Sequence, residues 1–163
     1  MEKFAIFNIA DETFGVTIGR VVEIIKPQKI FSVPGLPPFL TGVMSVRGAV
    51  IPLIDLRKRF GKQPSGKKER IIIIRSGQEK MGFLVDGIKE IMSFSPGEII
   101  RPPSIFKGFK TEYITGLGKK SEAIIILLDI DNLLTSEEKI MLKESMELIE
   151  ESGAGAEQAD RRQ

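Results

Sequence analysis

The chain has 163 residues, of which 42% are hydrophobic and 28% are charged, and its formal net charge is +2. This composition is typical of a globular protein with one domain or two small ones, and so small a charge does not by itself indicate a nucleic-acid partner. The sequence contains no Cys and no His, which excludes disulfides and zinc–thiolate sites and removes the commonest general base. It also lacks an apolar run that could span a bilayer or serve as a signal peptide, so we expect a cytoplasmic protein.

Short β-branched segments separated by turns predict a mainly β protein made of small barrels. In chain order, the strands expected in the first half cover residues 4–9, 13–18, 21–25, 43–46 and 49–54. Those expected in the second half cover residues 71–74, 81–85, 88–92 and 123–128. Two dipeptides predict tight turns: Arg47-Gly48, because Gly tolerates a positive φ, and Asp86-Gly87, a common hairpin sequence.

One helix is predicted, over residues 135–150. Thr135 and Glu138 have the spacing of a capping box at its start. Leu142, Met146 and Ile149 then form one apolar stripe, and we favour its packing on a barrel over a role in binding a partner. Residues 151–163 are small and polar, so we expect a disordered tail.

An internal repeat indicates how the strands are organised. Residues 12–16 (ETFGV) and 22–25 (VEII) recur 67 positions later as residues 79–83 (EKMGF) and 89–92 (KEIM). Residues 39–43 (FLTGV) and 49–56 (AVIPLIDL) recur 74 positions later as residues 113–117 (YITGL) and 123–130 (AIIILLDI). We therefore expect two similar barrels, residues 6–68 and 69–134, with a groove between them. Whether residues 1–10 cross from one barrel to the other is left open.

The residues present offer little for catalysis. The sequence contains no Gly-rich phosphate loop, nucleophile elbow or cluster of metal ligands. Asp55 and Asp129 are repeat-equivalent and each ends an apolar strand, so we expect them to cap turns rather than to react. The sequence thus predicts a protein that is not an enzyme and that binds no metal or organic cofactor.

Two features leave alternatives open. Residues 57–70 carry seven Lys and Arg against one Glu, which keeps an RNA-binding small barrel as an alternative function. Phe60 is the only aromatic residue in this segment, so we favour a solvated loop. Arg47, at a predicted turn, suits either a carboxylate of a partner protein or an internal pair with Glu23, and the sequence does not decide between them.

At these residues the chain resembles the chemotaxis coupling proteins, the CheW family. The matching segments are LTGVMSVRGAVIPLIDLR from Leu40 to Arg57, GFLVDGI from Gly82 to Ile88, and YITGL from Tyr113 to Leu117. Ser45 and Val46 depart from the Asn and Leu that are usual in the family. The resemblance covers about residues 4–145, so residues 1–145 are assigned to a CheW-like domain.

The resemblance implies two tandem five-stranded SH3-like β-barrels and a scaffold without catalytic activity. It implies an adaptor in chemotaxis signal transduction that couples the cytoplasmic tip of methyl-accepting chemoreceptors to the regulatory domain of the histidine kinase CheA. Such a protein is recruited to membrane-bound receptor arrays without entering the membrane, and it binds no nucleic acid.

The resemblance also implies a receptor-binding surface near the groove between the barrels. Carried over by motif position, its residues are Val21, Glu23, Gly42, Arg47 and Ile91, and the groove expected from the repeat adds Ile24 to an apolar floor. For the kinase we expect an exposed edge or end of one barrel with apolar residues at its centre.

Overall fold

The structure, a computed structural model, describes residues 1–65, 68–101 and 113–161, with side chains as far as residue 150. In the first half of the chain the elements are β1 (Glu2–Ile9), β2 (Glu12–Thr17), η1 (Ile18–Arg20), β3 (Val21–Ile25), β4 (Gly42–Val46), β5 (Ala49–Asp55) and α1 (Leu56–Arg59). The second half contains β6 (Arg70–Ser76), β7 (Glu79–Val85), β8 (Gly87–Phe94), η2 (Pro96–Glu98), β9 (Ile99–Ile100), β10 (Ile114–Lys120), β11 (Ala123–Leu128), η4 (Ile130–Asn132) and α2 (Ser136–Arg161).

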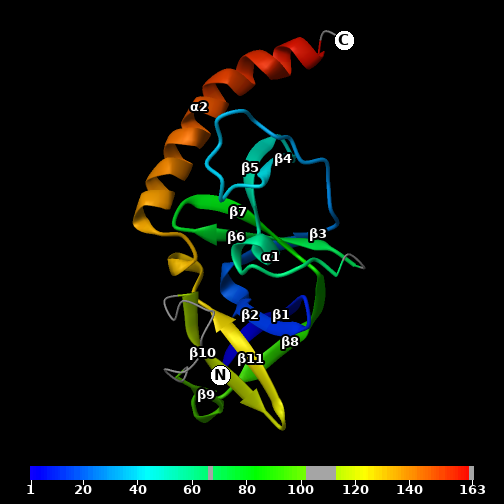
Figure 1. Ribbon diagram of the computed structural model, residues 1–163, viewed down its shortest axis with the longest axis vertical. Helices are drawn as coiled ribbons and strands as arrows, with labels where there is room; N and C mark the ends of the chain where they lie inside the picture. Colours follow the sequence, from blue (N-terminus) through cyan, green and yellow to red (C-terminus); the bar gives the residue numbers. More distant parts are fainter. Residues whose placement is uncertain (66–67, 102–112, 162–163) are drawn as a thin grey trace.

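These strands form two sheets, as the mainly β prediction requires. Sheet A has the order β8-β1-β2-β11-β10-β9, and sheet B has the order β3-β6-β7-β5-β4. Sheet A occupies the lower half of the molecule in Figure 1, and sheet B occupies the upper half beside α2. Two small sheets with one C-terminal helix agree with the expected pair of SH3-like barrels.

The boundaries expected for the two barrels, residues 6–68 and 69–134, are wrong. The hairpin of β1 and β2 joins sheet A, where β1 pairs with β8 and β2 pairs with β11. The equivalent hairpin of β6 and β7 joins sheet B, where β6 pairs with β3 and β7 pairs with β5. The exchange that the sequence leaves open for residues 1–10 therefore involves both hairpins, and each sheet is built from both halves of the chain.

The turn at Arg47-Gly48 is confirmed, but the hairpin at Asp86-Gly87 is not. Arg47 and Gly48 have φ values of 50° and 82°, and they connect Val46 to Ala49, which face each other across the ladder. At Asp86 the chain instead passes from β7 in sheet B to β8 in sheet A. A turn dipeptide marks a change of direction, but only the partners of the flanking strands decide whether those strands pair with each other.

The buried apolar residues form three clusters, one inside each sheet and one that holds the two sheets together. Sheet B encloses a cluster that includes Met44 and Leu53, and sheet A encloses a cluster that includes Phe4 and Phe94. The largest cluster lies between the sheets and takes side chains such as Phe14 from sheet A and Phe83 from sheet B. Both sheets therefore bury both faces over part of their area.

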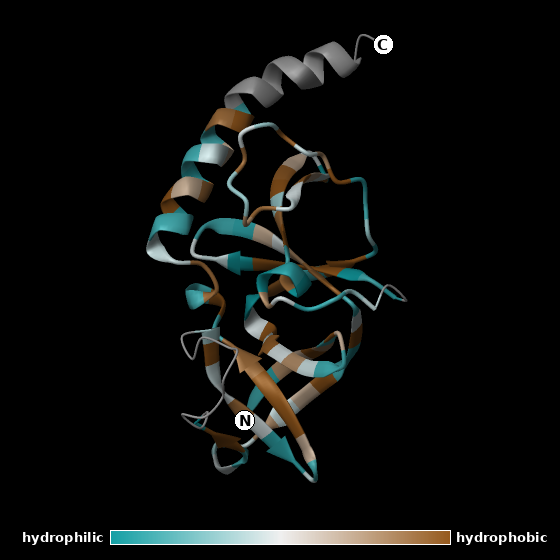
Figure 2. Ribbon diagram, viewed as in Figure 1, coloured by the Kyte–Doolittle hydropathy of each residue, from teal (hydrophilic) through white to brown (hydrophobic). Residues whose placement is uncertain are grey.

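The start of α2 and its apolar stripe are confirmed. The Glu138 amide donates to Thr135 Oγ1 at 3.1 Å, and the Thr135 amide donates to Glu138 Oε1 at 2.9 Å, so the capping box is complete. Leu142 and Met146 are buried in the central cluster, and Ile149 packs against it. Figure 2 shows apolar and polar residues alternating along this part of the helix.

The predicted end of this helix is wrong. We expect it to stop at residue 150, with a disordered tail over residues 151–163, but α2 continues to Arg161. Ala, Glu and Gln are frequent in this tail and have high helix propensity, so a small and polar composition is compatible with a helix as well as with disorder. Residues 162–163 lie outside the described residues.

Candidate functional site

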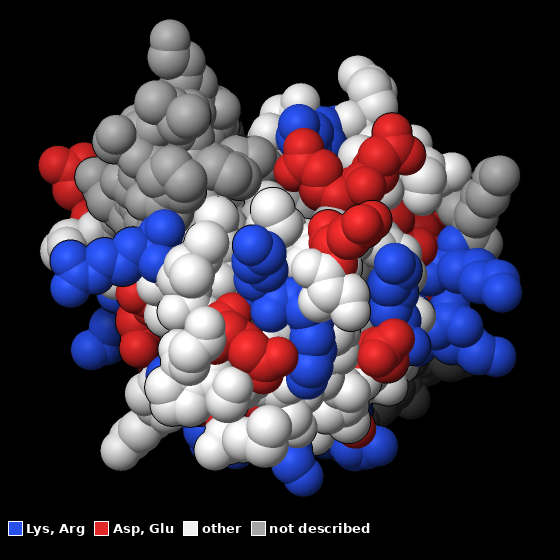
Figure 3. Space-filling view, turned by 90° about the horizontal axis from the view of Figure 1, so that it is seen from below, with Lys and Arg blue, Asp and Glu red and all other residues white. Residues whose placement is uncertain are grey.

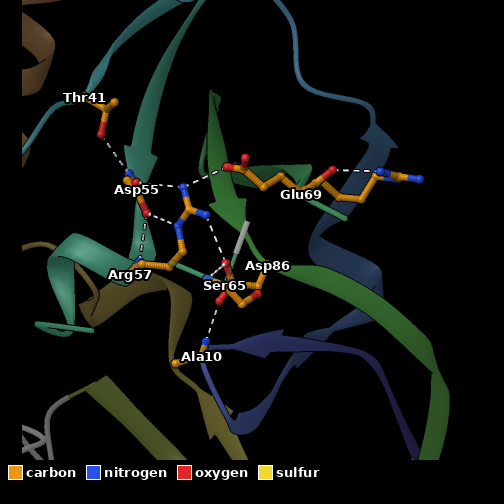
Figure 4. Close-up of polar contacts among 8 residues, drawn as sticks. Ala10, Thr41, Asp55, Arg57, Ser65, Glu69 and Asp86 are labelled. Atoms are coloured by element: carbon orange, nitrogen blue, oxygen red, sulfur yellow. Dashed lines mark hydrogen bonds and ion pairs between the residues drawn. The ribbon is translucent and has the colours of Figure 1, made fainter. Parts of the chain in front are cut away.

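A buried network of charges joins the two sheets where the chain crosses between them. Arg57, in α1, is 4% exposed, and its guanidinium bonds Asp55 through Nε at 2.9 Å and Nη2 at 3.0 Å. Its Nη1 lies 2.9 Å from Asp86 Oδ1, and its Nη2 lies 2.9 Å from Glu69 Oε2. Figure 4 shows these carboxylates around one guanidinium. One cation thus links β5, the residue that precedes β6 and the β7–β8 crossing.

Asp86 extends this network to the β1–β2 turn. Its carboxylate accepts hydrogen bonds from the backbone amides of Ala10 and Ser65 as well as from Arg57. Burial alone raises the pKa of Asp86, but the hydrogen bonds from Ala10, Arg57 and Ser65 outweigh it, so the pKa lies below the usual value. The ionised form is therefore the stable one, as a structural role requires.

The repeat-equivalent aspartates cap turns, as predicted. Asp55 is the N-cap of α1 and accepts from the Arg57 amide, and Asp129 is the N-cap of η4 and accepts from the Asp131 amide. Among the residues that the structure describes, no group of three or more acidic side chains is arranged to hold a metal ion.

The basic segment over residues 57–70 is only partly the solvated loop that we favour: residues 61, 63–65 and 68 are exposed and lie in no helix or strand, whereas other residues of the segment pack within the chain. Its described residues give no support for an RNA platform. Three of its cations are paired within the chain: Arg57 as described, Arg59 with Glu138, and Lys62 with Glu12 at 3.1 Å. The Phe60 ring stacks on Phe14, with centroids 5.5 Å apart, so it is engaged in packing. Lys67 lies outside the described residues.

The lower end of the molecule is also mixed in charge. In Figure 3, which views that end, Lys and Arg side chains are interspersed with Asp and Glu side chains. A surface of mixed sign does not provide the continuous positive stripe that follows a nucleic-acid backbone.

The expected receptor-binding residues lie mainly on two edge strands, β3 of sheet B and β8 of sheet A. Ile24 is 39% exposed and pairs with Ile72, and Ile91 is 61% exposed and pairs with Ala5. Ile72 and Ala5 both belong to the central cluster between the sheets. Because directly paired residues point to the same face of a sheet, Ile24 and Ile91 lie on the two faces that enclose the central cluster.

A β-bulge in β3 brings Val21 to the same face as Ile24. The register shifts between Val21 and Glu23, so that Val21 pairs with Ile74 and Glu23 pairs with Ile73. Val21 consequently packs against the central cluster, whereas Glu23 lies on the opposite face of the strand, on the side of the cluster inside sheet B. Val21 and Ile24 thus share one face of β3 and Glu23 lies on the other, while Ile91 lies on the face of sheet A that encloses the central cluster.

Arg47 and Glu23 form the internal pair that was one of the two alternatives. Arg47 Nη1 lies 2.6 Å from Glu23 Oε2, while the Arg47 side chain remains 78% exposed. The pair leaves most of the guanidinium accessible, so it does not exclude a further carboxylate.

Gly42 is buried and has a role in packing, so it is not itself part of an exposed contact surface. It is buried, and a Cβ at this position would lie 2.7 Å from the Phe31 carbonyl oxygen and 2.6 Å from the Ile30 side chain. Gly116 is its repeat equivalent and approaches Ile99 and Ile100 in the same way. Each glycine therefore permits close approach of one segment to the edge of a sheet.

Sequence reasoning missed the exposed apolar residues beside these glycines. Phe31, at 45% exposed, bridges to Val43 in sheet B, and Ile100, at 42% exposed, pairs with Leu117 in sheet A. Ile124, at 55% exposed, shares a sheet face with Ile100, because it lies two residues from Ile126, which pairs with Leu117. The repeated Thr-Gly dipeptides at 41–42 and 115–116 mark both places in the sequence.

Two sheets that exchange hairpins and expose apolar residues at their edges define a double-barrel binding domain. The chain matches the CheW-like domain model over residues 3–138, and it belongs to this family.

Relatives and a solved structure agree with this membership. The chain is 35% identical to the chemotaxis protein CheW of Klebsiella aerogenes over 143 residues, which are 86% of each protein. It is 29% identical to CheW of Bacillus subtilis, over 83% of this chain and 88% of that protein. The crystal structure of the scaffolding protein TtCheW from Thermoanaerobacter tengcongensis matches with a TM-score of 0.76 and 32% identity, over 84% of this chain and 90% of that one. These similarities support a scaffold or adaptor role in chemotaxis, and none of them supports RNA binding.

None of the helices in the described part of the chain combines the length and the hydropathy that a membrane crossing needs.

Proposed function

We propose that this chain is a non-catalytic adaptor that binds the cytoplasmic tip of a chemoreceptor and the regulatory domain of the histidine kinase CheA at the same time. The observation that carries the proposal is the presence of two separate exposed apolar surfaces. One consists of Ile24 and Ile91 on the edge strands, and the other consists of Ile100 and Ile124 on sheet A. An adaptor needs two independent surfaces, and binding to the receptor would recruit it to membrane-bound arrays. The absence of His and Cys from the sequence favours a role without catalysis.

The receptor site consists of Val21, Ile24 and Ile91 as an apolar floor, with Glu23 on the other face of β3 and Arg47 paired to it. An amphipathic helix buries its apolar stripe on such a floor. Arg47, in the β4–β5 turn next to Glu23, then binds a carboxylate or the carbonyl end of that helix. It can do so because its side chain is mostly accessible. Gly42 contributes by letting the residue 30–31 segment pack beside β4.

Replacing Arg47 by Ala tests this site. We expect about 30-fold weaker binding of a receptor-tip fragment, because loss of an Arg hot spot costs ~2 kcal/mol of binding free energy. Kinase binding and thermal stability change little, because an exposed pair contributes at most about 1 kcal/mol to folding. Lys58→Ala, which removes another exposed cation, is the control. Unchanged receptor affinity would remove Arg47 from the site, and parallel loss of stability and both affinities would show a purely structural pair.

The kinase site is the part of sheet A around Ile100 and Ile124, at the β9 edge, which lies opposite the β8 edge that carries Ile91. Sheet B offers the equivalent position Phe31, but the Lys29 ammonium lies over that ring, 4.8 Å from its centroid. Its second apolar residue, Val50, is also less exposed than Ile124. Among the described residues, sheet A therefore has two exposed apolar side chains at this position, Ile100 and Ile124, with Lys119 at their rim.

The repeat provides a matched pair of variants. Ile100→Glu should weaken binding of the kinase regulatory domain by tenfold or more and leave receptor binding unchanged, because it places a charge in an apolar contact. Phe31→Glu, at the equivalent position of sheet B, should have little effect. The reverse result would move the kinase site to sheet B. Hydrogen exchange with the kinase domain that protected only α2 would exclude both sheets.

A further inference from the structure

A cavity lies between α2 and the β6–β7 hairpin, on the opposite side of α2 from its solvent-exposed apolar residues. Its volume is about 340 Å³, which is within the range of small-molecule sites. The floor is apolar and is built from side chains of four elements (β5, β7, η4 and α2) and the segment before α2: Pro52, Met81, Ile130, Leu134, Leu142 and Met146. In Figure 1, α2 passes beside the turn that joins β6 to β7. The cavity is distinct from β3, β8 and the Ile100 patch, and none of their residues line it.

The mouth of the cavity is cationic. Lys80, Lys139 and Lys143 line it and are exposed, and Glu79 is the only acidic residue in the lining. None of these three lysines forms an ion pair with the residues that the structure describes. Asp131, near Lys139, is instead bound by Arg20 and Ser76. Three ammonium groups that form no ion pair within the described part of the chain therefore line an opening to an apolar floor.

We propose that this cavity binds an amphipathic carboxylate, a molecule with one apolar chain and a single carboxylate, about the size of decanoate. The chain occupies the floor between Met81 and Met146, and the carboxylate lies among Lys80, Lys139 and Lys143. A carboxylate is attracted by the three ammonium groups, whereas a neutral apolar molecule gains nothing from them. A cation would be repelled by them. The proposal is independent of the receptor and kinase assignments.

Chain length and charge give the first test. Isothermal titration of the full chain should show saturable binding of decanoate below its micelle concentration. Octanoate should bind about tenfold more weakly, because each buried CH₂ contributes ~0.8 kcal/mol. Decyltrimethylammonium, which has the same chain and the opposite charge, should bind at least tenfold more weakly than decanoate. Decanoate should also raise the Tm, since it binds the folded state.

A charge-reversed variant locates the site. Lys139→Glu combined with Lys143→Glu should weaken decanoate binding about tenfold, because each lost ion pair at a partly exposed site is worth up to ~1 kcal/mol. The control, Lys26→Glu combined with Lys89→Glu, makes the same change in net charge at exposed positions outside the cavity and should leave binding unchanged. Both pairs lie on the surface, so folding is expected to persist.

Three results in these titrations would overturn the proposal, and a fourth comes from vesicle binding. They are the absence of decanoate binding at millimolar concentration, equal binding of decanoate and decyltrimethylammonium, and equal loss of binding in the two double variants. Association with anionic phospholipid vesicles in the absence of decanoate binding would assign the lysines to a membrane surface and would also overturn it.

Discussion

Arg57 shows how one residue can change the interpretation of a segment. In the sequence it begins a basic run, but in the structure its guanidinium is buried among Asp55, Glu69 and Asp86. A buried cation is stable only where carboxylates and hydrogen bonds replace its water. Charge patterning alone does not distinguish such a residue from a solvated one, because the acidic partners lie on other elements.

Replacing Arg57 by Ala should lower the free energy of unfolding by about 3–5 kcal/mol, because it leaves the buried carboxylates of Asp55 and Asp86 without a counter-charge. Chemical denaturation at neutral pH measures the change. Lys58→Ala, in the same short helix but exposed, should stay within about 0.5 kcal/mol of the parent chain. Equal effects of the two variants would show that the network contributes little.

The carboxylates of the folded chain predict how stability depends on pH. The pKa of Asp131 is lowered by its hydrogen bond from Arg20, and the pKa values of Asp86 and Glu138 are lowered because hydrogen bonds outweigh the effect of burial. A lowered pKa in the folded state stabilises it above the ordinary carboxyl range of about 4. That stabilisation is lost as the pH falls through the lower, folded-state pKa values.

Urea unfolding should therefore give a constant free energy between about pH 6 and 7, because the sequence has no His to titrate there. The free energy should fall steadily below about pH 4.5. Asp86→Asn should be less stable at neutral pH. Its unfolding free energy should also fall less steeply with decreasing pH, because one carboxyl group with a lowered pKa is removed. A stability maximum near pH 4 would contradict this account.

At the scale of elements, the start of α2 and the 47–48 turn could be predicted because their signals are local. Thr135 and Glu138 cap the helix through hydrogen bonds between residues only three apart in the sequence. Gly48 adopts the positive φ that its own turn requires. The β7–β8 crossing could not be predicted, because Asp86 is held by Arg57 and Ala10, which are distant in sequence. The bulge that sets the face of Val21 likewise depends on pairing with β6.

Two leucines of α2 test how much its packing contributes. Leu142 is buried in the central cluster, whereas Leu148 is 64% exposed. Leu142→Ala should cost about 2–3 kcal/mol of unfolding free energy, because it leaves a cavity in the core. Leu148→Ala should change it by less than about 0.5 kcal/mol, since Leu and Ala have similar helix propensities. A loss at Leu148 as large as at Leu142 would indicate that its face is also covered in solution.

At the scale of the whole molecule, the repeat predicted two similar barrels but not which strands each barrel contains. The β1–β2 hairpin and the β6–β7 hairpin are equivalent, and each lies between equivalent partners: β8 and β11 for one, β3 and β5 for the other. A repeat unit closed on itself would satisfy the same pairings, so the sequence pattern is identical for both arrangements. The same limit applies to the candidate surfaces. The repeat shows that Ile24 and Ile91 are equivalent positions, but it does not predict that both lie beside the central cluster.

The exchange predicts how the chain behaves when it is cut between residues 66 and 67, in the connection from α1 to β6. The N-terminal fragment contains β1 and β2 but not their partners β8 and β11, and the other fragment contains β6 and β7 without β3 and β5. Each fragment alone would expose the apolar face of its hairpin, so we expect each to be unfolded or aggregated. Mixed during refolding, the two should form a folded 1:1 complex, detectable by size-exclusion chromatography and by a dispersed NMR spectrum. A cooperative thermal transition of the isolated N-terminal fragment would contradict this expectation, because it would mean that β1 and β2 close on β3 and β5 within one repeat. In that case the hairpins of the uncut chain would be exchanged only because the two halves are covalently connected, and not because the halves are complementary.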